Sequence, residues 1–135
     1  HLIGLKKLVM LNLEQTKITD AGLATLGNAG FRQLHTLTLN NTPITDEALT
    51  HVGRLTTLRD LRLSNTKIGD KGLAHLQNLN QVKILLLAGT NITDEGLKHL
   101  VGLNSLTTVS VSQTGVTQEG INRLREALPA CRIDQ

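Results

Sequence analysis

The segment Thr90-Asn91-Ile92-Thr93-Asp94 is one of five related segments that recur along the chain at nearly fixed spacing. The other four copies are Thr16–Asp20 (TKITD), Thr42–Asp46 (TPITD), Thr66–Asp70 (TKIGD) and Thr114–Gln118 (TGVTQ). Successive copies begin 26, 24, 24 and 24 residues apart. A period of roughly 20 to 29 residues is typical of solenoids whose units each contribute a strand and a short helix, and no such unit buries its apolar face alone. The sequence therefore predicts a stacked repeat fold whose function lies on a surface.

Apolar residues on either side of each threonine define the strand and the helix of a unit. Upstream, two apolar residues such as Leu11 and Leu13 lie two positions apart, so they share one face of a strand. Downstream, a pair such as Leu23 and Leu26 lies three positions apart, which fits one stripe of a short helix. We expect strands at 10–14, 36–40, 60–64, 84–88 and 108–112, with a short sixth strand at Ile133 covering the core. Parallel strands joined by helices predict an α/β right-handed solenoid with the sheet on the concave face and the helices on the convex face.

The repeat pattern L-x-x-L-x-L-x-x-T-x-I-T-D-x-G-L-x-x-L resembles that of leucine-rich repeats of the cysteine-containing, F-box-type subclass, with threonine in place of cysteine. It looks closer still to a threonine-bearing form abundant in bacterial proteins, notably those of planctomycetes. The ending Leu128–Ile133 (LPACRI) also resembles the closing segment of that group. The resemblance covers nearly the whole chain, so it implies one leucine-rich-repeat domain over residues 1–135. It implies a protein-binding module and carries no catalytic residues.

The chain is expected to begin in the middle of a repeat, because the sequence His1–Leu8 lines up with His99–Leu106. Two explanations stay open: a piece of a longer protein, which we favour, or an unusual cap. The sequence indicates no compartment.

Composition narrows the partner classes. The net charge is +3, and the basic residues are dispersed along the sequence with no column evident, which argues against a nucleic-acid partner. Phe31 is the only aromatic residue, so the aromatic anchors of many tight interfaces are absent. No apolar run approaches the roughly 20 residues that span a bilayer, so we expect no membrane insertion. The single cysteine, Cys131, is expected to point inward as a small apolar filler.

The repeated polar residues are expected to be structural. The threonine that ends each strand motif should form a hydrogen-bonding ladder between coils, and either residue of each Thr-Asp step could cap the following helix. Glycine recurs just inside the helices at Gly22, Gly72, Gly96 and Gly120, with Ala48 in the second unit. Because glycine costs about 1 kcal/mol against alanine in a helix, its recurrence indicates that a larger side chain would collide with the adjacent coil. A two-residue insertion at Gly27–Phe31 should form a bulge, with Phe31 in an inward position.

A column of histidines is the strongest candidate for a metal site. His51, His75 and His99 occupy one helical position in three successive repeats, and neutral imidazole is a common zinc ligand. No cysteine or carboxylate shares the column, so we favour a repeat-consensus residue that hydrogen bonds to a neighbouring loop, and we expect no metal or other cofactor. The chain has no Gly-x-Ser-x-Gly, His-Glu-x-x-His or phosphate-binding glycine loop, so we expect no enzyme.

The candidate binding site lies where the strands depart from the repeat. Ile84 and Leu86 are apolar at positions that face solvent on the concave side, and Asp60 and Arg62 lie on the strand beside them. We expect the partner-binding residues to be Asp60, Arg62, Ile84, Leu86, Ala88, Thr108 and Ser110. The predicted function is a non-catalytic interaction module that binds a protein through this face. The alternative is a structural or oligomerising segment of a larger protein, which self-associates.

Overall fold

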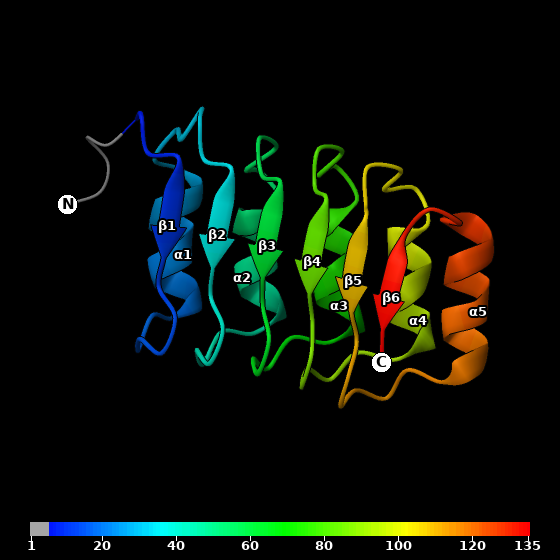
Figure 1. The fold of residues 1–135 in the computed structure, drawn as a ribbon. Coiled ribbons are helices and arrows are strands. Elements are labelled where there is room, and N and C mark those ends of the chain that lie inside the picture. The colour runs from blue at the N-terminus through cyan, green and yellow to red at the C-terminus, as the bar shows by residue number, and fades with distance from the viewer. Residues whose placement is uncertain (1–5) are drawn as a thin grey trace.

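The computed structural model describes residues 6–135, which form a single parallel sheet backed on one side by helices (Figure 1). The six strands are β1 (Met10–Asn12), β2 (Thr36–Thr38), β3 (Asp60–Arg62), β4 (Ile84–Leu86), β5 (Thr108–Ser110) and β6 (Arg132–Asp134), and they pair in chain order. The helices between them are α1 (Asp20–Gly27), α2 (Asp46–Val52), α3 (Asp70–Leu73), α4 (Asp94–Leu97) and α5 (Gln118–Ala127), with the 3-10 helices η1 (Ala74–Leu76) and η2 (Lys98–Leu100) continuing α3 and α4. The expected α/β leucine-rich-repeat solenoid, with its sheet on the concave face and its helices on the convex face, is confirmed.

Register places equivalent residues of successive repeats side by side. Thr36 pairs with Asp60, Asp60 with Ile84, Ile84 with Thr108, and Thr108 with Arg132. The next outward position gives a second row, from Asn12 through Thr38, Arg62, Leu86 and Ser110 to Asp134. The sixth strand around Ile133 is confirmed.

The strands are shorter than predicted, with three residues in place of five. Two further backbone hydrogen bonds to the next coil follow each of β1 to β4, such as Leu39 N–H to the Arg62 carbonyl at 2.8 Å and Asn41 N–H to the Ser64 carbonyl at 2.9 Å, and the chain then turns. The turn uses one left-handed residue per repeat, at Gln15, Asn41, Asn65, Gly89 and Gln113, with φ between 55° and 67°. Such a backbone conformation cannot continue a strand, so none of these strands extends past its left-handed residue.

The core is a leucine stack that runs the length of the solenoid. Leu37, Leu61 and Leu85 are each fully buried, as are the corresponding helix residues Leu49 and Leu73. The single aromatic residue and the single cysteine both point inward as expected, with Phe31 5% and Cys131 7% exposed.

The stack is covered unevenly at its two ends. Beside β1, the inward residues Leu8, Leu11, Leu13 and Ile18 are only partly buried. At the other end Ile133 of β6 is 6% exposed. The prediction that the chain begins mid-repeat depends mainly on residues 1–5, which lie outside the described residues.

The threonines that end the strand motifs bond within their own coil, and an aspartate links each coil to the next. Each ladder threonine donates its hydroxyl to a carbonyl three residues earlier in its own coil, as Thr66 does to Leu63 at 2.7 Å, so the expected ladder between coils was wrong. The bonds between coils run instead to the aspartate at the start of each helix. Asp20 and Asp70 accept from both the N–H and the hydroxyl of Thr45 and Thr93 in the following repeat, at 2.7–2.9 Å.

This link also identifies the helix caps. Thr45, Thr93 and Thr117 are the N-cap residues of α2, α4 and α5, and their hydroxyls accept from N–H groups of the first turn. The threonine hydroxyl is thus held by the preceding coil while it caps its own helix, and this geometry fixes the distance between helices of neighbouring repeats.

The recurring glycine leaves room for the linking carboxylate, which confirms the expected steric reason in the later repeats. A Cβ atom at Gly72 would lie 2.5 Å from Asp46 Oδ1, and Cβ atoms at Gly96 and Gly120 would contact Asp70 and Asp94 in the same way. Gly22 differs, because its Cβ would meet Ile18 of its own coil at 3.0 Å. A methyl group is accommodated in the second repeat, where Ala48 is fully buried.

Candidate functional site on the concave face

The concave face carries an ion pair beside an apolar strand. On β3, Arg62 Nε donates to Asp60 Oδ1 at 3.0 Å and Arg62 Nη2 donates to Asp60 Oδ2 at 2.8 Å. This two-pronged contact with Asp60 raises the pKa of Arg62 above its ordinary value. The Asp60 side chain is 17% exposed and that of Arg62 is 43% exposed, so the guanidinium covers the carboxylate and remains accessible itself.

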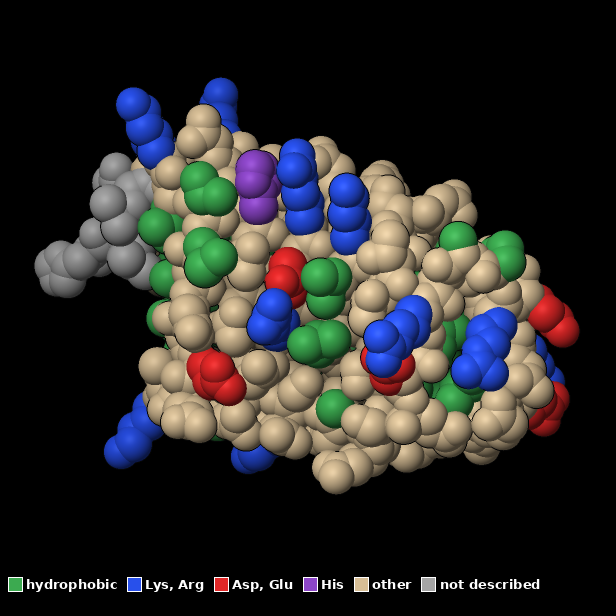
Figure 2. Space-filling view, viewed as in Figure 1, with side chains coloured by type: hydrophobic (Ala, Val, Ile, Leu, Met, Phe, Trp, Pro, Cys, Tyr) green, Lys and Arg blue, Asp and Glu red, His purple; other side chains and the backbone are tan. Residues whose placement is uncertain are grey.

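Ile84 and Leu86 lie directly against this pair. Ile84 is the register partner of Asp60, and Leu86 is the register partner of Arg62. Both side chains are half-buried, whereas Leu85 and Leu87 on the same strand are fully buried in the core. Figure 2 shows hydrophobic side chains beside an acidic and a basic group over the middle of the sheet. The two outward residues are therefore apolar without contributing to the main core.

A second ion pair lies on β6, across β5 from the apolar strand. Arg132 Nε donates to Asp134 Oδ1 at 2.8 Å. Through Thr108, Arg132 lies in the same row as Asp60, and through Ser110, Asp134 lies in the same row as Arg62. The acidic and basic residues have therefore exchanged rows relative to β3. Sequence reasoning placed Ile133 inward and omitted Arg132 and Asp134, although the alternation of a strand around Ile133 would have directed both onto the concave face.

The predicted site residues are otherwise brought together as expected. Register places Ile84 and Leu86 between β3, which carries Asp60 and Arg62, and β5, which carries Thr108 and Ser110. Ala88 follows β4 and is half-buried just before the left-handed Gly89. The seven residues form one continuous surface, and their role in binding stays a prediction.

The expectation that basic residues share no column was wrong. His35, Arg59 and Lys83 each immediately precede a strand, 24 residues apart. Their backbones are linked in register, because Arg59 N–H donates to the His35 carbonyl and Lys83 N–H to the Arg59 carbonyl, both at 2.8 Å. In Figure 2 one histidine and two Lys or Arg side chains stand in a row above the middle of the sheet. The common spacing was a signal in the sequence, but it becomes a column only when the repeats are stacked.

The histidine column does not assemble a metal site. Across the described part of the chain, no three histidine, cysteine, aspartate or glutamate side chains are placed to hold one ion. His99 Nδ1 lies 3.0 Å from Gln77 Nε2, a partner from the preceding coil, which fits the loop hydrogen bond expected for this column. His75 is exposed, and Nδ1 of His51 is buried without a hydrogen-bond partner.

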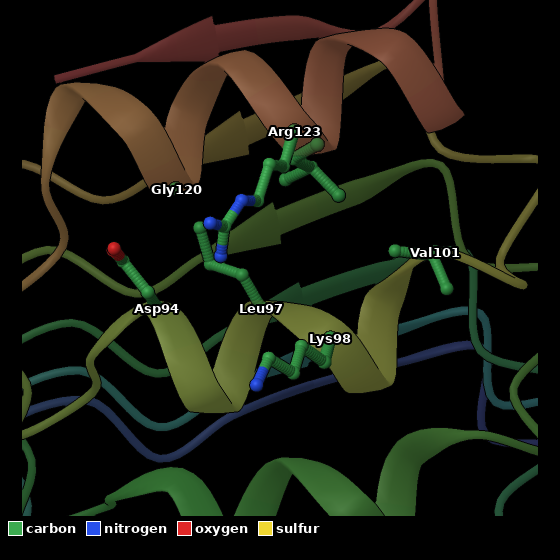
Figure 3. Close-up of a pocket in the computed structure, with 7 residues that line it drawn as sticks. Asp94, Leu97, Lys98, Val101, Gly120 and Arg123 are labelled. Carbon is green, nitrogen blue, oxygen red and sulfur yellow. The ribbon is translucent and has the colours of Figure 1, made fainter.

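A small cavity lies on the convex side between the helical segment α4–η2 and α5 (Figure 3). Its volume is about 40 Å³, and Leu97, Val101 and Leu124 supply its apolar wall. The cations beside it are already paired, Lys98 with Glu95 at 2.6 Å and Arg123 with Glu119. Ligand pockets for small molecules usually measure about 300 to 1,000 Å³, so this cavity is far smaller than a cofactor site.

Comparison with known proteins agrees with this architecture. Residues 54–76 and 78–101 match the family model described as Leucine Rich repeat. These two segments are similar to leucine-rich repeats, and the same strand and helix arrangement continues on both sides of them. The finer resemblance to the F-box-type subclass and to its planctomycete form stays a prediction. No curated protein matches the chain.

Three similar solved structures are bacterial. An internalin (inlF) of Listeria monocytogenes is 28% identical with a TM-score of 0.83, over 99% of this chain and 36% of its own. Internalin C2 of the same species is 26% identical with a TM-score of 0.74, over 91% of this chain and 50% of its own. A leucine-rich-repeat protein of Leptospira interrogans is 21% identical with a TM-score of 0.69, over 99% of this chain and 38% of its own, and supports the fold alone. The chain thus spans half or less of each of these proteins.

Among residues 6–135, no helix is both long enough and apolar enough to cross a membrane.

Proposed function

We propose that this chain is a non-catalytic module that binds a protein partner through its concave face, over Asp60, Arg62, Ile84, Leu86, Ala88, Thr108 and Ser110. The observation that carries the proposal is the orientation of β4. Leu85 and Leu87 are fully buried in the core, while Ile84 and Leu86 between and beside them face outward and are only half-buried. Apolar side chains at these positions add little to folding and are available for a complex.

Magnitudes indicate what this patch can contribute. Full burial of an isoleucine or leucine side chain is worth about 1.5 to 3 kcal/mol, and a tenfold change in affinity corresponds to about 1.4 kcal/mol. Ile84 and Leu86 are already half-buried, so the two together supply roughly one such increment on binding. Stable interfaces cover about 800 Å² on each partner, so the surrounding polar residues must be included. The Asp60–Arg62 pair is suited to be one of these polar contacts, because its two hydrogen bonds already fix its geometry before a partner binds.

The absence of a catalytic role is part of the same proposal. Asp20 and Asp70 accept hydrogen bonds from the next repeat's threonine, as Asp46 does from the Gly69 N–H at 2.6 Å. The regular carboxylates are therefore occupied by linking the coils. Catalysis would require a group that departs from the repeat and has a specific partner in a cavity.

A second candidate function is self-association at the β1 end. Val9 and Met10 are 49% and 64% exposed, and Leu11 and Leu13 beside them are only partly buried. Unpaired strand edges with apolar neighbours are templates for association with another chain. Neither Val9 nor Met10 belongs to the proposed concave patch on β3 to β5, so the two candidates can be separated by mutation.

The experiment compares three forms of the chain. Ile84→Ser with Leu86→Ser removes the apolar patch, and Val101→Ser is the matched control because Val101 is 46% exposed on the convex side. Each form is checked for its unfolding midpoint, immobilised to capture proteins from a lysate of the source cell, and analysed for self-association by sedimentation. We expect at least one identified protein to be retained by the parent chain and the control and lost by the double variant, with the unfolding midpoint unchanged.

Other outcomes discriminate between the candidates. Self-association that is retained in the double variant, with no change in captured proteins, would favour the oligomer at the β1 end. A capture profile that is the same for all three forms would show that the concave patch is not the working surface.

A further inference from the structure

We propose that the partner presents an acidic segment that also carries an apolar side chain, with its carboxylates against Arg59 and Lys83 and its apolar group on Ile84 and Leu86. This inference rests on the proposed function, because it names the chemistry of the partner for the same face. It comes from the arrangement of charge around the patch.

The first step is the geometry of the basic column formed by His35, Arg59 and Lys83. The Arg59 N–H donates to the His35 carbonyl and the Lys83 N–H to the Arg59 carbonyl, each at 2.8 Å, so the three residues are equivalent in successive coils. Neighbouring parallel strands lie about 4.8 Å apart, and side chains at one register position stand beside each other. Figure 2 shows a row of this composition on the sheet side of the molecule.

The second step is that these cations have no acidic partner. Four ion pairs occur between residues 6 and 135, and none involves Arg59 or Lys83. Both side chains are exposed. Like charges in adjacent positions across a sheet destabilise each other, so an approaching carboxylate relieves repulsion as well as forming new contacts.

The third step is that the acidic groups within the strands of this face are already paired, whereas Glu14, which follows β1, is in no ion pair of the described residues and accepts only from Asn41 Nδ2 at 3.4 Å. Asp60 is held by Arg62, and Asp134 by Arg132. Arg59 and Lys83, the cations without an acidic partner, therefore give a positive electrostatic potential beside the starts of β3 and β4. This potential favours an anionic partner.

The fourth step is the contact between the column and the apolar patch. Lys83 directly precedes Ile84, and Arg59 directly precedes Asp60, the register partner of Ile84. One extended peptide segment could therefore place an acidic side chain on the column and an apolar one on β4. A nucleic acid fits less well, because single-strand sites combine a longer basic groove with stacking aromatics, and the only aromatic residue, Phe31, is 5% exposed.

The test selects short random peptides displayed on phage against the whole immobilised chain. The strongest binder is then synthesised with a fluorescent label, together with an analogue in which every Glu and Asp is replaced by its amide. Affinity is measured by fluorescence anisotropy for the parent chain, for Arg59→Gln with Lys83→Gln, and for Ile84→Ser with Leu86→Ser. The matched control is Lys17→Gln with Lys67→Gln, which removes the same charge from exposed positions elsewhere. Circular dichroism checks that every variant is folded.

We expect the selected peptides to combine Asp or Glu with Leu, Ile or Phe. Removing Arg59 and Lys83, or amidating the peptide, should weaken binding about tenfold at low salt, whereas the lysine control should not. The loss should shrink as ionic strength rises from about 0.01 M to about 1 M, because the Debye length falls from about 30 Å to 3 Å.

The contrary outcomes separate this inference from the proposed function. One contrary result is that the amide analogue is bound as tightly as the acidic peptide, with both losing affinity for the Ile84→Ser and Leu86→Ser variant. That result would overturn the acidic partner and leave the concave face as the binding surface. Binding that survives both double variants, or no enrichment over a blank surface, would count against both proposals. If a single-stranded oligonucleotide or heparin binds the Ile84→Ser and Leu86→Ser variant as well as the parent chain, the occupant is a general polyanion and not a peptide. If the parent chain is a dimer that dissociates in the Arg59→Gln and Lys83→Gln variant, the occupant is a second copy of the chain.

Discussion

Asp94 holds Thr117 of the following repeat through both atoms of its carboxylate. Oδ1 accepts the Thr117 backbone N–H at 2.8 Å, and Oδ2 accepts the Thr117 hydroxyl at 2.6 Å. The same hydroxyl accepts the Gly120 N–H at 3.2 Å, so the carboxylate, the cap and the first turn of α5 form one connected chain of hydrogen bonds. The repeat motif thus encodes the connection between coils.

Replacing this aspartate tests the connection. Asp94→Ala should lower the unfolding midpoint, because it leaves two donors of Thr117 without their acceptors and loosens the cap of α5. Gln118→Ala is the matched control, since Gln118 occupies the equivalent position in the fifth repeat and only bonds Asn122 of its own helix at 3.0 Å. The control should stay within about 0.5 kcal/mol of the parent chain in urea unfolding. Equal losses for the two variants would contradict the connecting role of Asp94.

The pH dependence of stability follows from the same contact. Hydrogen bonds from the Thr117 hydroxyl and then from its backbone N–H lower the pKa of Asp94 in the folded chain. A carboxyl whose folded pKa is depressed stabilises the fold at pH values above its unfolded pKa of about 3.9, and this stabilisation is lost as the pH falls through the lower folded value. The free energy of unfolding of the parent chain should therefore fall more steeply on acidification below about pH 4 than that of Asp94→Asn. Parallel pH curves for the two proteins would contradict this assignment.

Much of the fold could be predicted because five copies of the pattern carry the same information. The inward leucines, the register of the columns and the sixth strand all follow from a period of 24 residues and strand alternation. The length of the strands did not follow, because the inward alternation continues after the regular strands end, as at Leu39 and Leu63, which follow β2 and β3 and are fully buried. The acceptor of the hydroxyl of each threonine that ends a strand motif also required the three-dimensional structure, since this hydroxyl can reach a carbonyl of its own coil or of the next one.

The candidate site was predicted less completely, for a related reason. Ile84 and Leu86 were conspicuous because they break the polar pattern of their own columns. Arg59 and Lys83 break no pattern along the chain, and they become a feature only when stacking places them about 4.8 Å apart. Arg132 and Asp134 were missed because the last strand lies outside the five copies used to define the columns.

The glycine inside α3 should resist enlargement. In Gly72→Ala the new methyl group would lie 2.5 Å from Asp46 Oδ1 and 3.2 Å from Asp46 Cα, so the coils must separate locally. Overpacking costs about 1 to 3 kcal/mol, and the gain in helix propensity of about 1 kcal/mol offsets only part of it. Gly102→Ala, which adds a methyl group with no atom within 4 Å, should be near neutral. A chemical-denaturation series decides, and an equal effect at both positions would show that the space at Gly72 is not limiting.

The histidines should behave as parts of the scaffold. His75 is exposed, so His75→Ala should change the free energy of unfolding by no more than about 0.5 kcal/mol. His99→Ala should cost somewhat more, because it removes the 3.0 Å contact with Gln77. Adding zinc should leave the melting temperature of the parent chain unchanged. A rise with zinc that disappears in His75→Ala would establish a metal site.

The two ends of the solenoid should differ in local stability, and two equivalent amides provide the comparison. Leu13 N–H donates to the Thr38 carbonyl and Val111 N–H donates to the Asp134 carbonyl, both at 2.8 Å, so the hydrogen bonds themselves are matched. Their surroundings are not matched, because Leu13 is only partly buried whereas Val111 is 1% exposed. Stability in a solenoid is close to a sum of unit and neighbour terms, so the coil with less buried surface should open first. Native-state hydrogen exchange should therefore be at least about tenfold faster at Leu13 than at Val111, which corresponds to about 1.4 kcal/mol in opening free energy. Exchange that is equal at the two amides, or slower at Leu13, would mean that the β1 end is covered as well as the β6 end.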